Sequence, residues 1–316
     1  MWPARPAASS PDEPERVPYD RQVTSGIERL NPDQQTLLRD WFPDSVVESD
    51  HSWGLVETSV LELTHQGTRL IIKAGGRNDH HLEREVHAHL NWLRPWTSRG
   101  RAPTLLRFDT EAKLLATRFL PGDLVVETER VNEPETYRQA GQLLAMLHAQ
   151  LAVTHDEYEA EENAKALAWL AKPHRIDPLT EQRLLAEIAS WPTPVAELVP
   201  THGDWQPRNW LVHRGVVSII DFGRAALRPA ISDFARLAAQ DFLRDAALEA
   251  AFLEGYGPDP RDPKAWHRIR VREAIGTAAW AYQVGDAAFE AQGHRMIADV
   301  LSGRRPLPEP GRSPRF

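Results

Sequence analysis

The chain contains no cysteine among its 316 residues. This absence excludes a disulfide framework, a thiolate zinc site and a cysteine nucleophile. Long apolar runs are also missing, whereas a membrane-spanning helix needs about 18 or more apolar residues in a row. The proline-rich start of the chain has no apolar stretch of the kind found in a secretory signal. We therefore expect a cytoplasmic protein with no membrane partner.

Basic residues are in deficit as well. The sequence has 37 Lys and Arg against 45 Asp and Glu, which gives a net charge of −8 with the histidines neutral. Binding to nucleic acid without sequence preference requires a basic footprint, so no nucleic-acid partner is expected. Hydrophobic residues make up 41% and charged residues 26%, which suits a soluble protein with a substantial core. Composition does not indicate the oligomeric state.

Prolines mark both ends of the chain, and a change of pattern divides the middle. We expect a flexible proline-rich arm over residues 1–22 and a flexible basic tail over 303–316. Branched apolar segments within residues 55–73, and again from 114 to 120, predict strands. Leucine and valine spaced three and four apart predict a helix over 79–93, and from about residue 134 the pattern is mostly helical.

The most polar motif lies in the helical part of the chain. It is T-H-G-D-W-Q-P-R-N-W, residues 201–210, and I-I-D-F-G follows at 219–223. Asp204, Asn209 and Asp221 are the side chains in it that suit phosphoryl transfer, because that reaction needs a carboxylate at the attacking hydroxyl and oxygen ligands for Mg²⁺. The segment between the two parts reads as a hairpin. We expect this hairpin to bring Asn209 and Asp221 together, because its two strands are neighbours.

These residues carry a family resemblance. H-G-D-x-x-P-x-N followed by I-I-D-F-G resembles the aminoglycoside phosphotransferase and choline kinase superfamily. The I-I-K that ends at Lys73 resembles the small-lobe strand whose lysine holds nucleotide phosphates. L-E-R-E, residues 82–85, resembles the helix that carries the glutamate paired with this lysine. The spacing of the family assigns that role to Glu85, with Glu83 as the alternative.

The resemblance implies an α+β, bilobal protein-kinase-like fold. A small antiparallel-sheet N-terminal lobe over 23–119 would bind the nucleotide, and a larger, mainly helical C-terminal lobe over 120–302 would hold the catalytic and acceptor-binding groups. The cofactors implied are ATP or GTP with Mg²⁺. The adenine is expected to bond the hinge backbone at Thr117 and Phe119, within the hinge-like sequence L-A-T-R-F-L-P-G.

The same resemblance assigns roles within the polar motif. Asp204 is the predicted catalytic base, and Asn209 and Asp221 are the predicted metal ligands. Asp233 is expected to brace the catalytic loop. His202 looks like a base in isolation, but in this loop we expect it to hold the backbone by hydrogen bonding.

Two departures from the pattern concern the nucleotide and the acceptor. The loop that would cover the nucleotide, near Ser52-Trp53-Gly54, is poor in glycine. Arg208 and Trp205 stand where smaller or aliphatic residues are common.

A protein kinase is disfavoured, because only nine residues (224–232) separate D-F-G from the next helical segment and no A-P-E follows. A catalytically silent nucleotide-binding or scaffold protein remains the non-enzyme alternative.

The acceptor is the least determined part of the prediction. The resemblance allows aminoglycosides and other antibiotics, choline, homoserine and sugars. The carboxylate-rich run H-D-E-Y-E-A-E-E, residues 155–162, favours a hydroxylated amine as the small-molecule partner. Asp286 and Glu290 in the last helical region are further candidates for contacting it.

Overall fold

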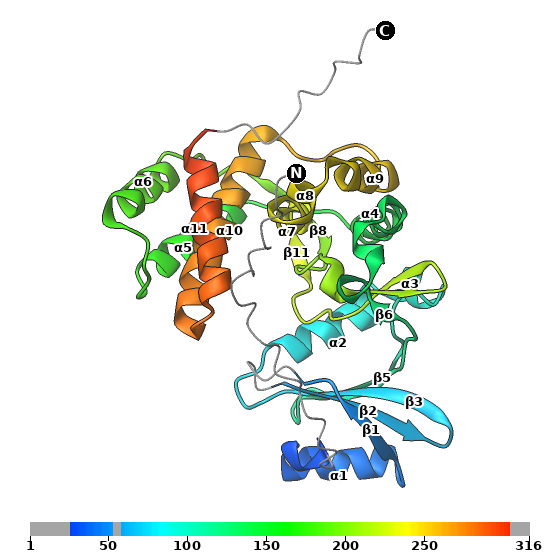
Figure 1. Cartoon of the computed structure of the whole chain (residues 1–316). Coiled ribbons are helices and arrows are strands. Elements are labelled where there is room, and N and C mark those ends of the chain that lie inside the picture. The colour runs from blue at the N-terminus through cyan, green and yellow to red at the C-terminus, as the bar shows by residue number, and fades with distance from the viewer. Residues whose placement is uncertain (1–25, 53–57, 304–316) are drawn as a thin grey trace, which may run out of the picture.

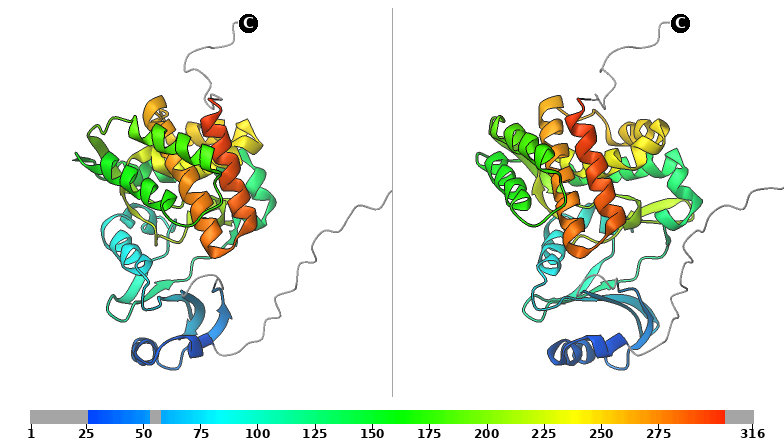
Figure 2. Two further views of the ribbon diagram at one scale, coloured as in Figure 1. Left: turned by 90° about the vertical axis from the view of Figure 1, so that its left-hand side faces the viewer. Right: turned by 60° about the vertical axis from the view of Figure 1, so that its left-hand side comes forward.

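The computed structural model describes residues 26–52 and 58–303, and these form two lobes. An antiparallel sheet and helix α1 make the smaller lobe, at the bottom of Figure 1, while most helices gather in the larger lobe above it. Both views of Figure 2 show the same separation. The expected α+β bilobal architecture is confirmed. The arm 1–22 and all but the first residue of the tail 303–316 lie outside the described residues.

The small lobe is built on a five-stranded antiparallel sheet with the strand order β1-β2-β3-β5-β4. The β2–β3 hairpin turns at Gln66 and Gly67, whose φ angles are 48° and 75°. Its strands are β1 (Val46–Asp50), β2 (Ser59–His65), β3 (Thr68–Ala74), β4 (Leu105–Asp109) and β5 (Leu114–Arg118).

Helix α1 (Pro32–Trp41) covers one face of this sheet. The helix starts at a proline, and the side-chain oxygen of Asn31 caps it by accepting a hydrogen bond from the N–H of Gln34. The chain before this cap forms a short 3₁₀ turn, η1 (Gly26–Arg29). Leu38 packs with apolar side chains of β2 and β3, which closes the small lobe's core.

Helix α2 (His81–Asn91) contacts both lobes. Leu82 and Val86 pack against Leu115 of the small-lobe sheet. At the other end of the helix, Ala88 belongs to the main core of the large lobe, which also takes in Trp96 of the short helix α3 (Arg94–Thr97). The predicted helix over 79–93 therefore joins the two lobes.

The large lobe packs two pairs of helices very closely, α4 with α9 and α10 with α11. Gly255 of α9 lies so near the backbone of α4 that a Cβ there would fall on the carbonyl oxygen of Arg138. The helix α10 ends at Gly285, which adopts the left-handed conformation with φ 76°. The helices are α4 (Pro134–His148), α5 (Tyr158–Leu170), α6 (Pro178–Ala189), α7 (Ala235–Ala239), α8 (Asp241–Arg244), α9 (Ala246–Tyr256), α10 (Pro263–Val284) and α11 (Ala287–Leu301). Short 3₁₀ turns are η2 (Val125–Glu127), η3 (Glu129–Asn132), η4 (Pro207–Asn209) and η5 (Ala230–Phe234).

Two small antiparallel sheets of the large lobe frame the polar motif. One has the order β10-β9-β6 and the other β11-β8-β7. Residues 202–209 connect β8 to β9, and residues 220–225 connect β10 to β11, so both connections lie between the two sheets. The strands are β6 (Asp123–Leu124), β7 (Val153–His155), β8 (Ala196–Thr201), β9 (Trp210–His213), β10 (Val216–Ile219) and β11 (Ala226–Arg228). Within the described ranges, no helix is both long and apolar enough to cross a bilayer.

Candidate active site

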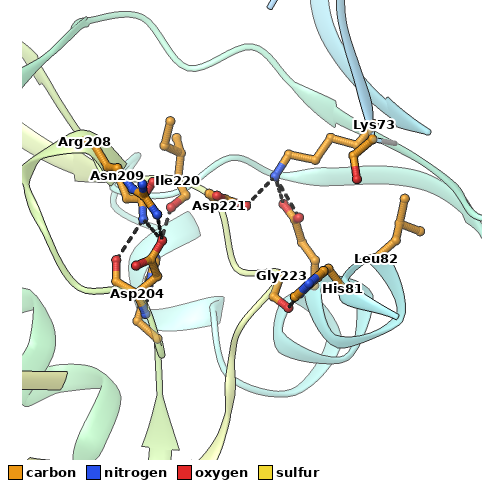
Figure 3. Close-up of polar contacts among 12 residues, drawn as sticks. Lys73, His81, Leu82, Asp204, Arg208, Asn209, Ile220, Asp221 and Gly223 are labelled. Carbon is orange, nitrogen blue, oxygen red and sulfur yellow. Dashed lines mark hydrogen bonds and ion pairs between the residues drawn. The ribbon is translucent and has the colours of Figure 1, made fainter. Parts of the chain in front are cut away.

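Asp204 lies at the centre of a dense set of donors (Figure 3). Its Oδ2 accepts from Arg208 Nη2 at 2.7 Å and from Asn209 Nδ2 at 3.0 Å. Its Oδ1 lies 2.8 Å from Arg236 Nη1 and also accepts from Gln206 Nε2. The carboxylate is only 3% exposed, so these donors take the place of water around it.

The electrostatic environment keeps Asp204 ionised. Burial alone would raise the pKa of this carboxyl group, because a low dielectric disfavours charge. The guanidinium groups of Arg236 and Arg208 outweigh burial, and they hold the pKa of Asp204 well below its usual range. Asp204 is therefore a carboxylate at neutral pH and a strong hydrogen-bond acceptor, but a weak base toward a free proton.

The loop that carries Asp204 is fixed from behind by Asp233. Asp233 Oδ1 accepts the N–H of Gly203 at 2.7 Å, and Oδ2 accepts the N–H of His202 at 2.8 Å. His148 Nε2 lies 3.1 Å from the same Oδ2. Gly203 has φ 79°, and a Cβ there would collide with the backbone of Arg224. The loop thus depends on a buried carboxylate and on one glycine.

His202 is a structural residue in this arrangement. Its Nδ1 lies 3.3 Å from the backbone N–H of Asp204, and its Nε2 lies 3.0 Å from the carbonyl oxygen of Ile220. Because Nδ1 accepts, Nε2 is left to carry the proton and donate it to Ile220. The ring therefore ties the Asp204 loop to the segment that holds Asp221, which is the backbone-holding role expected from the sequence.

Lys73 joins the two lobes at the cleft. Its Nζ lies 2.8 Å from Glu85 Oε2 and 3.0 Å from Asp221 Oδ1 (Figure 3). Burial opposes the charge on Lys73, but Asp221 and Glu85 raise the pKa of this amine above its usual range. Lys73 lowers the pKa of Asp221 in turn. Glu85 is buried and Glu83 is exposed, so Glu85 is the partner that the structure gives to Lys73.

Asn209 and Asp221 lie beside each other across the β9–β10 hairpin. The N–H of Ile220 donates to the carbonyl oxygen of Asn209 at 3.0 Å, which places the two side chains at one end of the hairpin. The Asn209 amide nitrogen is used by Asp204, so its amide oxygen remains for a ligand. An amide oxygen and a carboxylate oxygen fit Mg²⁺, which takes one or two protein oxygens and completes its shell with phosphates and water.

At the hinge, part of the backbone expected to bind the nucleotide base already takes part in the sheet. The N–H of Phe119 already donates to Arg69 O at 3.0 Å, and the Arg69 guanidinium lies over the Phe119 ring. Bonded pairs alternate along an antiparallel ladder, so Thr117 makes the next bonded pair with Ile71. The N–H groups of Thr117 and Phe119 therefore belong to the sheet. Among the described residues, the N–H of Leu120 has no protein partner.

A cavity of about 540 Å³ opens beside the Asp204 loop. It is bounded by the catalytic loop and by helices α2, α5, α10 and α11, with Trp169, Trp280 and Phe289 among its apolar walls. Four acidic residues line it, which are Glu162, Asp233, Glu273 and Asp286. Seven basic residues line it, which are Arg84, Lys165, Arg208, Arg224, Arg228, Arg236 and Arg272.

This charge distribution differs from the acidic acceptor pocket expected from the run 155–162. Glu159 is buried in ion pairs with Arg268 at 2.9 Å and with Arg272, so it serves the packing of α5 on α10. Glu162 does line the cavity, but it pairs with Lys165. The prediction that the run faces a cationic acceptor is therefore not supported by its contacts.

The two acids expected in the last helical region also have structural partners. Asp286 lines the cavity while capping α11 through the N–H of Phe289. Glu290 is buried outside the cavity lining, with Arg175 and His294 as its nearest cations.

Sequence reasoning missed two arginines close to Asp204. Arg236 contacts Asp204 from α7, and Arg224 follows D-F-G directly. Arg236 lies three residues after Asp233, and residues three apart on a helix share a face. A helix that continued from Asp233 was therefore the one signal in the sequence that Arg236 faces the Asp204 loop.

Comparison with known proteins gives a family and a fold. A family model described as the phosphotransferase enzyme family matches residues 59–270, which is more than half of the chain. No curated protein sequence matches the chain. Solved structures do, and their low sequence identities make them evidence of fold.

Three of these structures show the range. Choline kinase LicA from Streptococcus pneumoniae superposes with a TM-score of 0.62 at 13% identity, covering 85% of this chain and 97% of that one. A thermostable mutant of aminoglycoside phosphotransferase APH(4)-Ia, in a ternary complex with AMP-PNP and hygromycin B, gives 0.62 at 13% identity over 84% and 97%. Macrolide 2'-phosphotransferase MphH from Brachybacterium faecium gives 0.51 at 17% identity over 84% and 98%.

These matches confirm the resemblance to the aminoglycoside phosphotransferase and choline kinase superfamily that the motifs carry. They also confirm the predicted enzyme class, a phosphotransferase with an alcohol group as acceptor. The chain belongs to the phosphotransferase enzyme family.

Proposed function

We propose that the chain is a Mg²⁺-dependent small-molecule kinase that transfers the γ-phosphate of ATP or GTP to a hydroxyl group. The arrangement of Lys73 is the observation that carries this proposal. Its Nζ bridges Glu85 and Asp221 at 2.8 and 3.0 Å, while Asp204 lies on the neighbouring loop, bonded to Asn209. All the groups needed to bind a nucleotide and to orient an acceptor thus meet at one cleft.

The nucleotide is assigned to the small-lobe side of this cleft. Lys73 would hold its phosphates, and the base would bond the hinge backbone next to Thr117 and Phe119, where the N–H of Leu120 is free within the described residues. A bound Mg²⁺, held by Asn209 and Asp221, would neutralise charge on the phosphates. Similar structures have been solved with AMP-PNP in one protein and GDP in another, so the choice between ATP and GTP rests on measurement.

Asp204 is proposed to act on the acceptor hydroxyl. Two arginines pair with its carboxylate, and the side chain of Arg208 is 45% exposed whereas that of Arg236 is only 18% exposed. Arg208 is therefore the arginine that an acceptor can displace. The hydroxyl then donates to Asp204 Oδ2 in place of Arg208, while Arg236 and Gln206 stay on Oδ1.

The transfer step follows from this geometry. The hydroxyl oxygen bonds to the γ-phosphorus, the bond to the bridging β–γ oxygen breaks, and the nucleoside diphosphate leaves. The hydroxyl proton passes to Asp204 Oδ2. Because the pKa of Asp204 is low, we expect this proton to move late, when the new O–P bond has made the hydroxyl acidic. Orientation of the hydroxyl and charge neutralisation then supply most of the catalysis.

One observation favours a second candidate, a nucleotide-binding protein without turnover. Arg208 and Arg236 both form ion pairs with the carboxylate of Asp204. If Arg208 cannot move away, no acceptor hydroxyl reaches this carboxylate. The deciding assay couples nucleotide consumption to acceptor addition, with ATP and with GTP, and detects the phosphorylated product by mass spectrometry. The acceptors should include an aminoglycoside, choline, homoserine, an amino sugar and a hydroxy acid. Tight Mg-nucleotide binding without turnover for any acceptor would support the second candidate.

Asp204→Ala is expected to reduce turnover by at least about 10²-fold, because general-base assistance alone supplies about 10²–10⁴-fold. Nucleotide affinity should stay within a few-fold, since Asp204 lies on the acceptor side. Coupled turnover and titration calorimetry measure the two quantities. Retained turnover, or lost nucleotide binding, would contradict the assigned role.

Asp221→Ala is expected to weaken binding of the Mg-nucleotide, in contrast to Asp204→Ala. It removes a proposed metal ligand and one of the two carboxylates that face Lys73. Calorimetric titration with and without Mg²⁺ measures this, and Asp123→Ala, on the exposed strand β6, is the matched control. An unchanged dependence of nucleotide affinity on Mg²⁺ would show that Asp221 is not a ligand.

A further inference from the structure

The lining of the cavity beside Asp204 holds seven basic and four acidic residues. Two carboxylates just behind the lining neutralise part of this charge, because Asp204 pairs with Arg208 and Arg236, and Glu159 pairs with Arg272. All four acids already have partners. Glu162 pairs with Lys165 and Glu273 with Arg236. Asp233 is used by the catalytic loop, and Asp286 caps α11.

Three cations of the lining make no direct ion pair among the described residues, namely Arg84, Arg224 and Arg228. Asp204 and Glu273 attract Arg224 only from a greater distance. Arg228 is held in place by neutral acceptors, because its Nη1 donates to Thr201 Oγ1 at 3.0 Å and to the carbonyl oxygen of Arg224 at 2.9 Å. The Arg224 guanidinium is part-buried and makes no hydrogen bond within the described ranges. Burial, with Arg236 nearby, lowers its pKa.

A half-buried guanidinium without an acceptor is an unusual group. It has lost part of its hydration, and it is repelled by Arg236 and Arg208 while Asp204 and Glu273 attract it without bonding to it. Its N–H donors are therefore open to an anion that enters the cavity. Arginine is suited to that role, since its planar fork matches carboxylate and phosphate oxygens with two parallel hydrogen bonds.

The position of these arginines connects them with the acceptor. Arg224 and Arg228 flank the segment that leads from D-F-G into β11, and the same cavity is lined by Gly203 and Trp205 on either side of Asp204. We propose that the acceptor carries a carboxylate or phosphate group, bound by Arg224 and Arg228, which places its hydroxyl at Asp204. The acceptor class is therefore a hydroxylated acid rather than a hydroxylated amine. This inference rests on the proposed kinase function.

The competing explanation is that these arginines serve the nucleotide phosphates. It predicts a different phenotype, because loss of Arg224 would then weaken the Mg-nucleotide rather than the acceptor. Nucleotide affinity is for this reason measured beside acceptor affinity in every variant.

The test uses binding, so it does not require turnover. Protein saturated with Mg-AMP-PNP is titrated at constant ionic strength with four probes of similar size, which are glycerol, ethanolamine, glycerate and glycerol 3-phosphate. We expect the two anions to bind at least 10-fold more tightly than glycerol or ethanolamine. Arg224→Gln, alone and with Arg228→Gln, should reduce anion affinity by about 10- to 100-fold, as expected for loss of charge-assisted hydrogen bonds. Arg224→Lys should restore part of it.

Arg107→Gln is the matched control, because Arg107 is exposed on strand β4 of the small lobe and touches only backbone. It should leave all four affinities unchanged. Equal binding of ethanolamine and the anions, absence of anion binding, or anion affinity that survives the double variant would overturn the proposal. A loss confined to AMP-PNP affinity would assign the arginines to the nucleotide instead. If anions bind as expected but no acceptor is phosphorylated, the subsite stands and the kinase function fails.

Discussion

His89 on helix α2 should make the stability of the protein depend on pH below about pH 6.5. Its Nε2 is buried and has no hydrogen-bond partner among the described residues, while its ring meets Phe222 edge to face. Burial, reinforced by Lys73, lowers the pKa of His89 to about 3. The ring is therefore neutral in the folded protein at any pH above that value.

The size of the effect follows from the two pKa values. In the unfolded chain His89 should titrate near pH 6.5, so acidification through that value adds a proton to the unfolded state only. Stability contributed by the neutral ring is complete above pH 6.5 and is lost as the pH falls toward 3. Between pH 7 and pH 5 the loss amounts to about 2 kcal/mol from this residue alone.

The measurement is urea unfolding, followed by tryptophan fluorescence at pH 7 and pH 5, for the wild type and for His89→Gln. The variant can be less stable at both pH values, because glutamine does not match the ring. What matters is the difference between the two pH values, which should shrink by about 2 kcal/mol. His87→Gln, on the exposed face of the same helix, should leave the difference unchanged. An equal pH dependence in His89→Gln and the wild type would refute the reasoning.

Two further predictions use matched pairs and the same unfolding assay. Arg236→Ala should cost about 3 kcal/mol, because the buried Asp204 loses the less exposed of its two cationic partners. Arg208→Ala should cost about 0–1 kcal/mol, because this arginine is 45% exposed, and equal costs would contradict this account of Asp204. Gly255→Ala should cost about 1–3 kcal/mol, because its Cβ would meet the backbone of α4. Gly276→Ala in α10 has open space and should stabilise by about 0.5–1 kcal/mol, so destabilisation there would contradict the expected difference.

The spacing of the polar motif predicted much of the candidate site, because its parts are close in sequence. Asn209 and Asp221 are held together by a hairpin that the residues between them indicate by themselves. The Lys73–Glu85 pair came from the family spacing rather than from helical periodicity, which placed Glu83 nearer the apolar face.

The charges around the acceptor cavity could not be predicted in the same way. Arg268 and Arg272 neutralise Glu159 from a helix more than 100 residues away, so the run 155–162 looks like a free acidic surface in the sequence. Strand β1 was missed for a related reason. Its V-V-E-S-D pattern has two acids and no buried residue, so it resembles a loop until it pairs with β2.

Helix α2 has a mechanical consequence through its contacts with both lobes. His81 Nδ1 lies 2.9 Å from the carbonyl oxygen of Gly223, so the helix that carries Glu85 is also fastened to the D-F-G segment. A hinge rotation of the sheet alone would pull Lys73 away from Glu85 and Asp221 together, whereas a rotation that carried α2 along would break the bond to Gly223. The distance from Lys73 to Asp221 therefore increases in either motion, while the distance from Lys73 to Glu85 shows whether α2 moved with the sheet.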